Sequence, residues 1–143
     1  MTTHCKTPCP ACPYSRTCEP GALGGSPVEK YIGQALGPFL LPCHQHCDFT
    51  DPDWKLKVES TPQCAGAAVF RANLGVNALM PKGLHELPAN RGTVFSTAAE
   101  FVAHHRGVDL HTARMQLVLF PPEQMLRDEL ESKGRRIIPA DKL

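Results

Sequence analysis

The residues of this chain with the clearest capacity for chemistry are its seven cysteines, all of which lie within the first 64 residues. Cys9 and Cys12 form a Cys-x2-Cys pair, in which a tight turn can bring both sulfurs to one metal. Two thiolates do not complete a site. The other ligands must come from a set of cysteines and histidines elsewhere in the chain: Cys5, Cys18, Cys43, Cys47, Cys64, His44 and His46. The spacing therefore predicts a metal centre.

The position of Cys64 narrows the choice of metal ligands. It follows Thr61-Pro62, a typical helix start, and a thiol near a helix N-terminus has a lowered pKa. We favour four metal ligands, because together they would join the N-terminal segment, the middle loop and a helix start. These ligands are Cys9, Cys12, Cys43 and Cys64.

Two kinds of metal centre suit four thiolates. A proline follows both Cys9 and Cys12, which is common in iron-sulfur segments, whereas zinc knuckles more often have Gly or a small polar residue after the second cysteine. We therefore prefer a [4Fe-4S] cluster, with a zinc ion as the alternative. Either centre can be purely structural, and unligated buried thiols are a third interpretation.

The spacing Cys5-x3-Cys9-x2-Cys12 also matches the three-cysteine pattern of radical S-adenosylmethionine enzymes. We do not favour this interpretation, because those enzymes surround the cluster with a partial barrel that the remaining residues are too few to form. The residue before the third cysteine is also usually aromatic, and here it is Ala11.

Histidines and one aromatic-basic segment are further candidates. His44 follows a predicted ligand and is the candidate catalytic residue, as an alternative ligand or a proton donor beside the centre. We expect His104, His105 and His111 to be surface or helix-capping groups. Tyr14-Ser15-Arg16 could present an aromatic ring and a cation to a nucleotide or phosphate.

The elements that must position these residues are short. The 143 residues suit one domain, and the 14 prolines and 11 glycines break it into small pieces. Capping signals predict helices over 26–36, 61–75 and 97–107, and a last helix over 121–133. Residues 93–95 suit a short strand, and 76–92 suit an irregular loop. Residues 110–120 are ambiguous, since 115–120 suit either a buried strand or the end of a helix.

The expected fold class is α+β, with mostly short helices and irregular loops organised around a cysteine-ligated metal centre. Within this single domain, residues 1–75 would form the metal-ligating part, and 76–143 a helical C-terminal part with the basic tail 135–138. A formal net charge of +1 gives no global electrostatic case for nucleic acid. The sequence has neither a signal-peptide pattern nor a membrane span, so we expect a cytoplasmic protein with no membrane partner.

Three motifs stand out along the chain: Cys9-Pro10-Ala11-Cys12-Pro13-Tyr14, Pro42-Cys43-His44 and Gln63-Cys64-Ala65-Gly66. They resemble those of a family of small proteins of unknown function encoded by bacteriophages and prophages, and the resemblance covers about residues 9–105. It implies that Cys9, Cys12, Cys43 and Cys64 are the recurring thiols, with His44 beside them. It also implies that Cys5, Cys18 and Cys47 are additions particular to this sequence.

From this resemblance we expect the protein to act in the host cytoplasm. It suggests a binding or regulatory module that acts on nucleic-acid-related host or phage machinery, with a host or phage protein or nucleic acid as partner. The alternative is a small enzyme of phage DNA base modification, a transferase such as a methyltransferase on a modified nucleobase, with a pocket beside the centre. The sequence has no recognisable nucleophile-base pair, phosphate loop or carboxylate pair.

Overall fold

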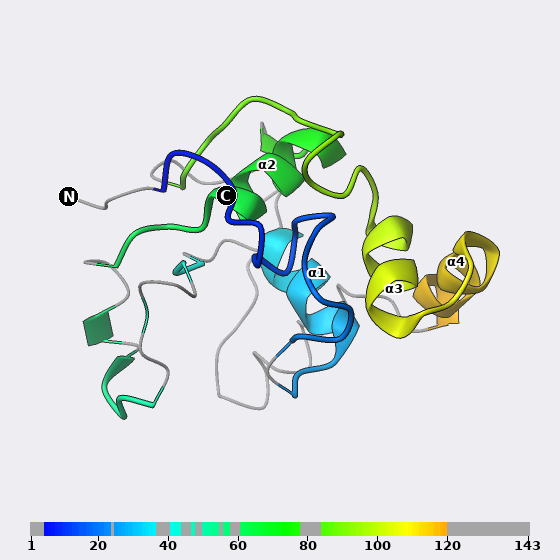
Figure 1. Cartoon of the computed structure of the whole chain (residues 1–143), viewed down its shortest axis with the longest axis horizontal. Helices are drawn as coiled ribbons and strands as arrows, with labels where there is room; N and C mark the ends of the chain where they lie inside the picture. Colours follow the sequence, from blue (N-terminus) through cyan, green and yellow to red (C-terminus); the bar gives the residue numbers. More distant parts are fainter. Residues whose placement is uncertain are drawn as a thin grey trace, which may run out of the picture.

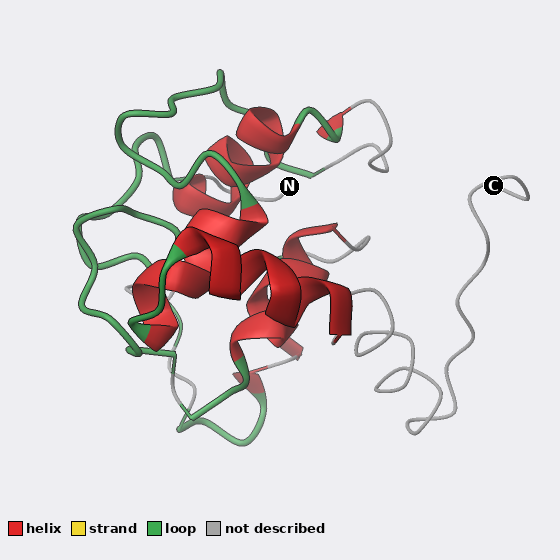
Figure 2. Ribbon diagram, turned by 90° about the vertical axis from the view of Figure 1, so that its right-hand side faces the viewer, coloured by secondary structure: helices red, strands yellow, loops and turns green. Residues whose placement is uncertain are grey.

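The computed structural model describes residues 5–23, 25–36, 41–43, 47, 50–54, 56–57, 61–77 and 84–119. This part of the chain is a small single domain with four helices and almost no strand (Figure 2). The helices are α1 (Val28–Leu36), α2 (Ala65–Leu74), α3 (Ala98–Arg106) and α4 (Leu110–Leu119). The predicted last helix and the basic tail lie outside the described residues.

Helix α1 lies within the range expected from the sequence, whereas α2 begins later than expected. Its N-cap is Cys64, which has an extended backbone and whose sulfur accepts a hydrogen bond from the N–H of Ala67 at 3.4 Å. Helix α2 ends at Gly75, whose φ of 73° is in the left-handed region that favours glycine. The thiol thus takes the capping position that Ser, Thr, Asp or Asn usually occupies.

Helix α3 has the predicted cap. The hydroxyl of Thr97 accepts a hydrogen bond from the N–H of Glu100 at 3.2 Å, and the carboxylate of Glu100 accepts one from the N–H of Ser96 at 3.1 Å. The ambiguous segment that follows is helix α4. Asp109 favours this helix, because its carboxylate accepts a hydrogen bond from the N–H of Thr112 at 2.7 Å.

The strand expected at 93–95 is reduced to an isolated bridge between Val94 and Ser15. The partner segment cannot extend this pairing, because it folds into successive turns in which Ser15 donates to the carbonyl of Cys12 and Cys18 donates to that of Ser15. A second isolated bridge joins Pro42 and Gln63. The described residues therefore do not confirm the β part of the expected α+β class.

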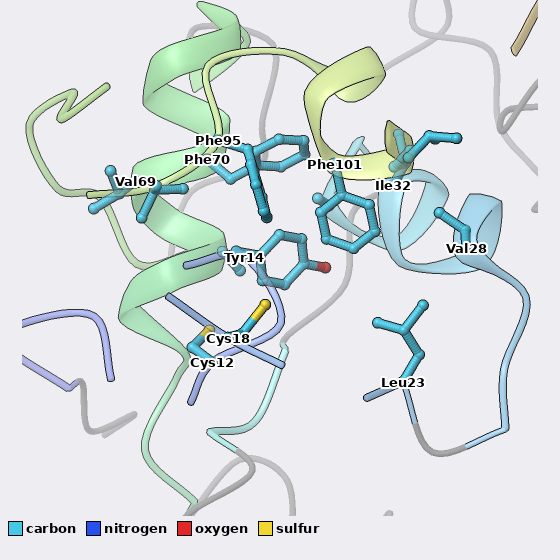
Figure 3. Packing of buried hydrophobic residues seen from close by; sticks show 14 of the residues in the cluster. Cys12, Tyr14, Cys18, Leu23, Val28, Ile32, Val69, Phe70, Phe95 and Phe101 are labelled. Carbon is cyan, nitrogen blue, oxygen red and sulfur yellow. The ribbon is translucent and has the colours of Figure 1, made fainter. Parts of the chain in front are cut away.

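Aromatic side chains form the centre of the core. The Tyr14 ring lies 5.2 Å from that of Phe70 and 5.4 Å from that of Phe101, measured between ring centroids (Figure 3). The Tyr14 hydroxyl donates to the carbonyl of Tyr31 on α1 at 2.8 Å. Tyr14 thereby ties the N-terminal segment to three helices, and this holds Cys12, two residues earlier, near the start of α2.

The helices surround this aromatic cluster. Helix α1 contacts both α2 and α3, and α4 packs on α3 at the side of the molecule away from α2 (Figure 1). The loop before α3 is fixed to α2 by buried Asn73, whose amide group donates to the carbonyls of Asn90, Val94 and Phe95. Its side-chain oxygen accepts from the N–H of Asn90. These bonds satisfy both ends of the buried amide.

Candidate metal centre

Cysteines from three segments of the chain line one pocket, whose volume is about 360 Å³. The lining cysteines are Cys5, Cys9, Cys12, Cys43 and Cys64. All four predicted ligands are therefore brought to one place, and Cys5 joins them.

Local hydrogen bonds explain why the segments converge. In the N-terminal turn, the N–H of Cys12 donates to the carbonyl of Cys9 at 2.9 Å. Across the second bridge, the N–H of Cys43 donates to the carbonyl of Pro62, and that of Cys64 donates to the carbonyl of Leu41, both at 2.8 Å. This antiparallel pairing sets Cys43 opposite Pro62 and Cys64 opposite Leu41, so both cysteines lie next to the bridge, where α2 begins.

Cys12 and Cys64 form a buried pair with their sulfurs 3.4 Å apart. The hydrogen bond from the Cys12 thiol is the main cause that lowers the pKa of Cys64, to about 7, and the backbone N–H groups of Ala67 and Gly66 add to it. The same hydrogen bond, together with burial, raises the pKa of Cys12. Cys64 is therefore the thiolate of the pair, in agreement with its expected position near a helix N-terminus.

Gly66 allows this close approach of Cys12 to α2. A Cβ atom at Gly66 would lie 2.3 Å from the sulfur of Cys12, a distance at which the two atoms would overlap. Any other residue would therefore displace Cys12. Gly66 is the last residue of one motif of the family resemblance, but the sequence predicted no role for it, because the reason for its being glycine is a contact with a residue 54 positions earlier.

Cys5, a candidate ligand that is not among the four favoured ones, also lines the pocket. Its N–H donates to the carbonyl of Gln63 at 3.1 Å, and its carbonyl accepts from the Nε2–H of His85 at 2.8 Å. Burial, followed by a hydrogen bond to the Cys43 thiol, raises the pKa of Cys5 to about 11. The sequence signal was the Cys-x3-Cys-x2-Cys spacing, which we had set aside together with the radical-enzyme interpretation.

Cys18 lies elsewhere, against α3. Its buried sulfur is 3.6 Å from the Nε2 atoms of both His104 and His105. The ring of His105 is fully engaged, since its Nδ1 accepts from the N–H of Gly21 at 3.0 Å and its Nε2–H donates to the carbonyl of Pro13 at 2.8 Å. No lone pair of this ring is free for a metal.

This finding corrects the expectation for the histidine cluster. His105 is only 7% exposed and joins α3 to the N-terminal turns, so it is neither a surface nor a capping group. Burial lowers its pKa and favours the neutral ring. His104 is half-buried and donates to the carbonyl of Cys18, while His111 is exposed as expected.

The suggested nucleotide contact at Tyr14-Ser15-Arg16 is also wrong. Tyr14 is 3% exposed and Ser15 is 1% exposed. Arg16 forms an ion pair with Glu100 at 2.7 Å and donates to the carbonyl of Arg91 at 2.8 Å. The segment is therefore used inside the fold.

Of the remaining candidates, the structure describes Cys47 alone. Cys47 is half-buried and is not among the residues that line it. His44 and His46 lie outside the described residues, so the role predicted for His44 stays a prediction.

The donor set of the pocket suits a soft metal. Thiols are the donors that bind zinc and iron-sulfur clusters, and the space next to Cys12 exists only because Gly66 has no side chain. Within the described ranges, no three or more Cys, His, Asp or Glu side chains converge closely enough to hold one metal ion without rearrangement. The cysteines surround a space instead of meeting at a point.

Two further findings bear on the protein as a whole. Searches against models of known protein families, curated proteins and solved structures found no match. Among the described helices, none has the length and apolar character needed to cross a membrane.

Proposed function

We propose that this chain binds a [4Fe-4S] cluster through Cys9, Cys12, Cys43 and Cys64, and acts as a binding or regulatory module whose fold depends on that centre. The observation that carries the proposal is the pocket of about 360 Å³, into which five cysteines from three segments of the chain converge. When bound, such a cluster supplies a covalent crosslink among these segments and can exchange one electron.

Pocket size supports a cluster over a zinc ion. Four thiolates on zinc lie about 3.8 Å from one another, since each Zn–S bond is ~2.3 Å long and the geometry is tetrahedral. A site of that kind needs little space, whereas a cluster of iron and sulfide atoms needs a cavity. One observation favours zinc, because the 3.4 Å between the sulfurs of Cys12 and Cys64 is close to the zinc spacing and would have to widen for a cluster.

The residues that line the pocket support a binding or regulatory module over an enzyme. Apart from the cysteines, the described lining residues are Lys6, Thr7, Pro8, Pro10, Ala65 and Gly66. This described lining includes no carboxylate or imidazole that could act as a general acid or base. The centre would therefore serve mainly to fix the N-terminal turns and the start of α2.

The proposed partner class is a host or phage protein, or a nucleic acid, of the nucleic-acid-related machinery in the host cytoplasm. It is supported only by the resemblance to phage-encoded proteins. With a formal net charge of +1, nucleic acid would have to be bound by a local patch and not by overall charge.

An enzyme of DNA base modification is the second candidate, and the pocket itself favours it. A volume of about 360 Å³ is within the range of small-molecule sites. Co-expression of the chain with modified DNA, followed by mass analysis of the nucleosides, tests this candidate. A mass gain of one methyl or other transferred group that requires Cys43 would favour the enzyme, and unchanged nucleosides would favour the module.

Anaerobic purification with metal and sulfide analysis tests the main proposal. We expect iron and acid-labile sulfide in equal amounts, together with a broad absorption band near ~400 nm that is typical of cluster proteins. A colourless protein with one equivalent of zinc would instead establish the alternative centre. A protein free of both metals would contradict the proposal.

A further inference from the structure

Cys12 and Cys64 are 52 positions apart in the sequence, and their sulfurs lie 3.4 Å from one another. Both are free thiols. A disulfide bond is ~2.05 Å long, so the two sulfurs need to approach by only about 1.4 Å to be joined. The fold therefore brings together two thiols that can form a bond with each other as well as with a metal.

The backbone around each of these cysteines is fixed by hydrogen bonds. In the N-terminal turn, the N–H of Cys12 donates to the carbonyl of Cys9, and the carbonyl of Cys12 accepts from the N–H of Ser15, both at 2.9 Å. The carbonyl of Cys64 accepts from the N–H of Ala68 at 3.2 Å, in the first turn of α2. The contact between the two sulfurs is thus a property of the folded chain, and an unfolded chain would not favour this pair over the other thiols.

A small oxidant can reach the pair from the pocket. Both cysteines line this space of about 360 Å³, which has room for a molecule as small as hydrogen peroxide. Cys64 is 8% exposed and Cys12 is 1% exposed, so Cys64 presents the more accessible sulfur. Cys18 is also buried, at 3% exposed, but it does not line the pocket. It is therefore the matched control.

We propose that Cys12 and Cys64 are a thiol–disulfide switch: in the metal-free chain, hydrogen peroxide oxidises them to a disulfide that joins the N-terminal turn to the start of α2. In the first step the sulfur of Cys64 attacks one peroxide oxygen, the O–O bond breaks, and a sulfenic acid and one water molecule form. In the second step the sulfur of Cys12 attacks that of Cys64 and releases a second water molecule. The two thiols lose two electrons and two protons, and the peroxide that gains them is reduced to water.

The disulfide also determines whether the pocket can hold a metal, and this part of the inference rests on the proposed function. A metal is ligated by thiolates, so oxidation of Cys12 and Cys64 removes two of the four predicted ligands together. Metal binding and the disulfide therefore exclude each other. A thiol reductant restores the site by thiol–disulfide exchange.

Peptide mapping of the full-length chain tests the disulfide. The chain is made metal-free with a chelator, treated with hydrogen peroxide and digested with trypsin without reductant. Trypsin releases Cys64 in the peptide 58–71, and Cys12 in the peptide 7–16, which also contains Cys9. We expect the two peptides to be linked, with a mass about 2 Da below their sum, because two hydrogen atoms are lost. Oxidation in urea should not favour this link.

Three variants assign the link to its two sulfurs. Cys12→Ala should lose the link between the two peptides, whereas Cys9→Ser and Cys18→Ser should keep it. The oxidised wild type should take up no iron on anaerobic reconstitution, and dithiothreitol should restore the uptake of the reduced chain. The oxidised chain should also unfold at a higher urea concentration than the reduced metal-free chain, since the disulfide constrains the unfolded state.

Unlinked peptides after oxidation of the wild type would overturn the inference, as would Cys64 joined to Cys9 or Cys43 in place of Cys12. Undiminished iron uptake by the oxidised chain would also overturn it. These results leave the proposed function in place, since that is judged from the metal content of the untreated chain. A chain that forms the Cys12–Cys64 disulfide but never holds a metal would confirm the disulfide and refute the proposed function.

Discussion

Gly66 determines how closely Cys12 can approach the start of α2. The sulfurs of Cys12 and Cys64 are 3.4 Å apart, and a methyl group at Gly66 would lie 2.3 Å from the sulfur of Cys12 and overlap it. A residue with no reactive group is thus as important to the pocket as the thiols themselves.

We expect Gly66→Ala to lower the free energy of unfolding by about 1–3 kcal/mol, as other overpacking substitutions do, and to reduce the metal bound per chain. Urea unfolding and metal analysis measure the two effects. Gly92→Ala is the matched control, since a Cβ there would meet only the side-chain oxygen of Asn90 at an ordinary contact distance of 3.7 Å. Equal stability and metal content in the two variants would contradict the close approach at Gly66.

The Cys12–Cys64 pair makes the stability of the metal-free chain depend on pH. Between the lowered pKa of Cys64, about 7, and the ordinary thiol value of ~8.5, the unfolded chain holds a proton that the folded chain has released. Stability therefore rises with pH over this range. Above it, the unfolded chain loses the proton that folded Cys12 keeps, because the pKa of Cys12 is raised, and stability falls.

Urea unfolding of the metal-free chain from pH 6.5 to pH 10 tests this dependence. We expect the free energy of unfolding to be greatest near pH ~8.5, and the rise below that value to be absent in Cys64→Ser. A wild-type stability that stays level or falls between pH 7 and pH 8.5 would show that Cys64 is not the thiolate of the pair.

At the level of elements, the helices follow local signals closely. The caps of α3 at Thr97 and Gly107 were predictable because each depends on residues within one turn of the helix. The start of α2 was predicted too early, because Gln63 pairs with Pro42 and the helix can begin only after this bridge. Pairing between distant segments therefore set this boundary, which local signals missed.

Replacing Asn73 tests how the loop before α3 is held against α2. Asn73→Ala would leave the carbonyls of Asn90, Val94 and Phe95 without their donor in a largely buried region. We expect a loss of about 2–4 kcal/mol in the free energy of unfolding, measured with urea. Gln34→Ala, which removes a half-buried amide on α1, should cost much less. Similar losses for both variants would mean that Asn73 does not anchor the loop before α3.

For the whole molecule, the sequence predicted the four favoured cysteines that line the pocket, but not all of the contacts that hold the surrounding segments together. The Cys-x2-Cys pair and the helix start at Cys64 pointed to the right segments, since both are local patterns. The contacts of Cys5 and the buried role of His105 could not be predicted, because their partners, such as His85 and Gly21, lie more than 75 residues away. Without strands of regular periodicity, the sequence gives little sign of which distant segments meet.

The central claim is that the pocket cysteines, and not the other thiols, hold a metal. It is tested most directly by the metal bound per chain in Cys64→Ser and Cys18→Ser, purified anaerobically beside the wild type. Both exchanges remove a buried thiol, but only Cys64 lines the pocket. The account predicts that Cys64→Ser loses its metal and that Cys18→Ser keeps the wild-type amount. Metal retained by Cys64→Ser and lost by Cys18→Ser would contradict it.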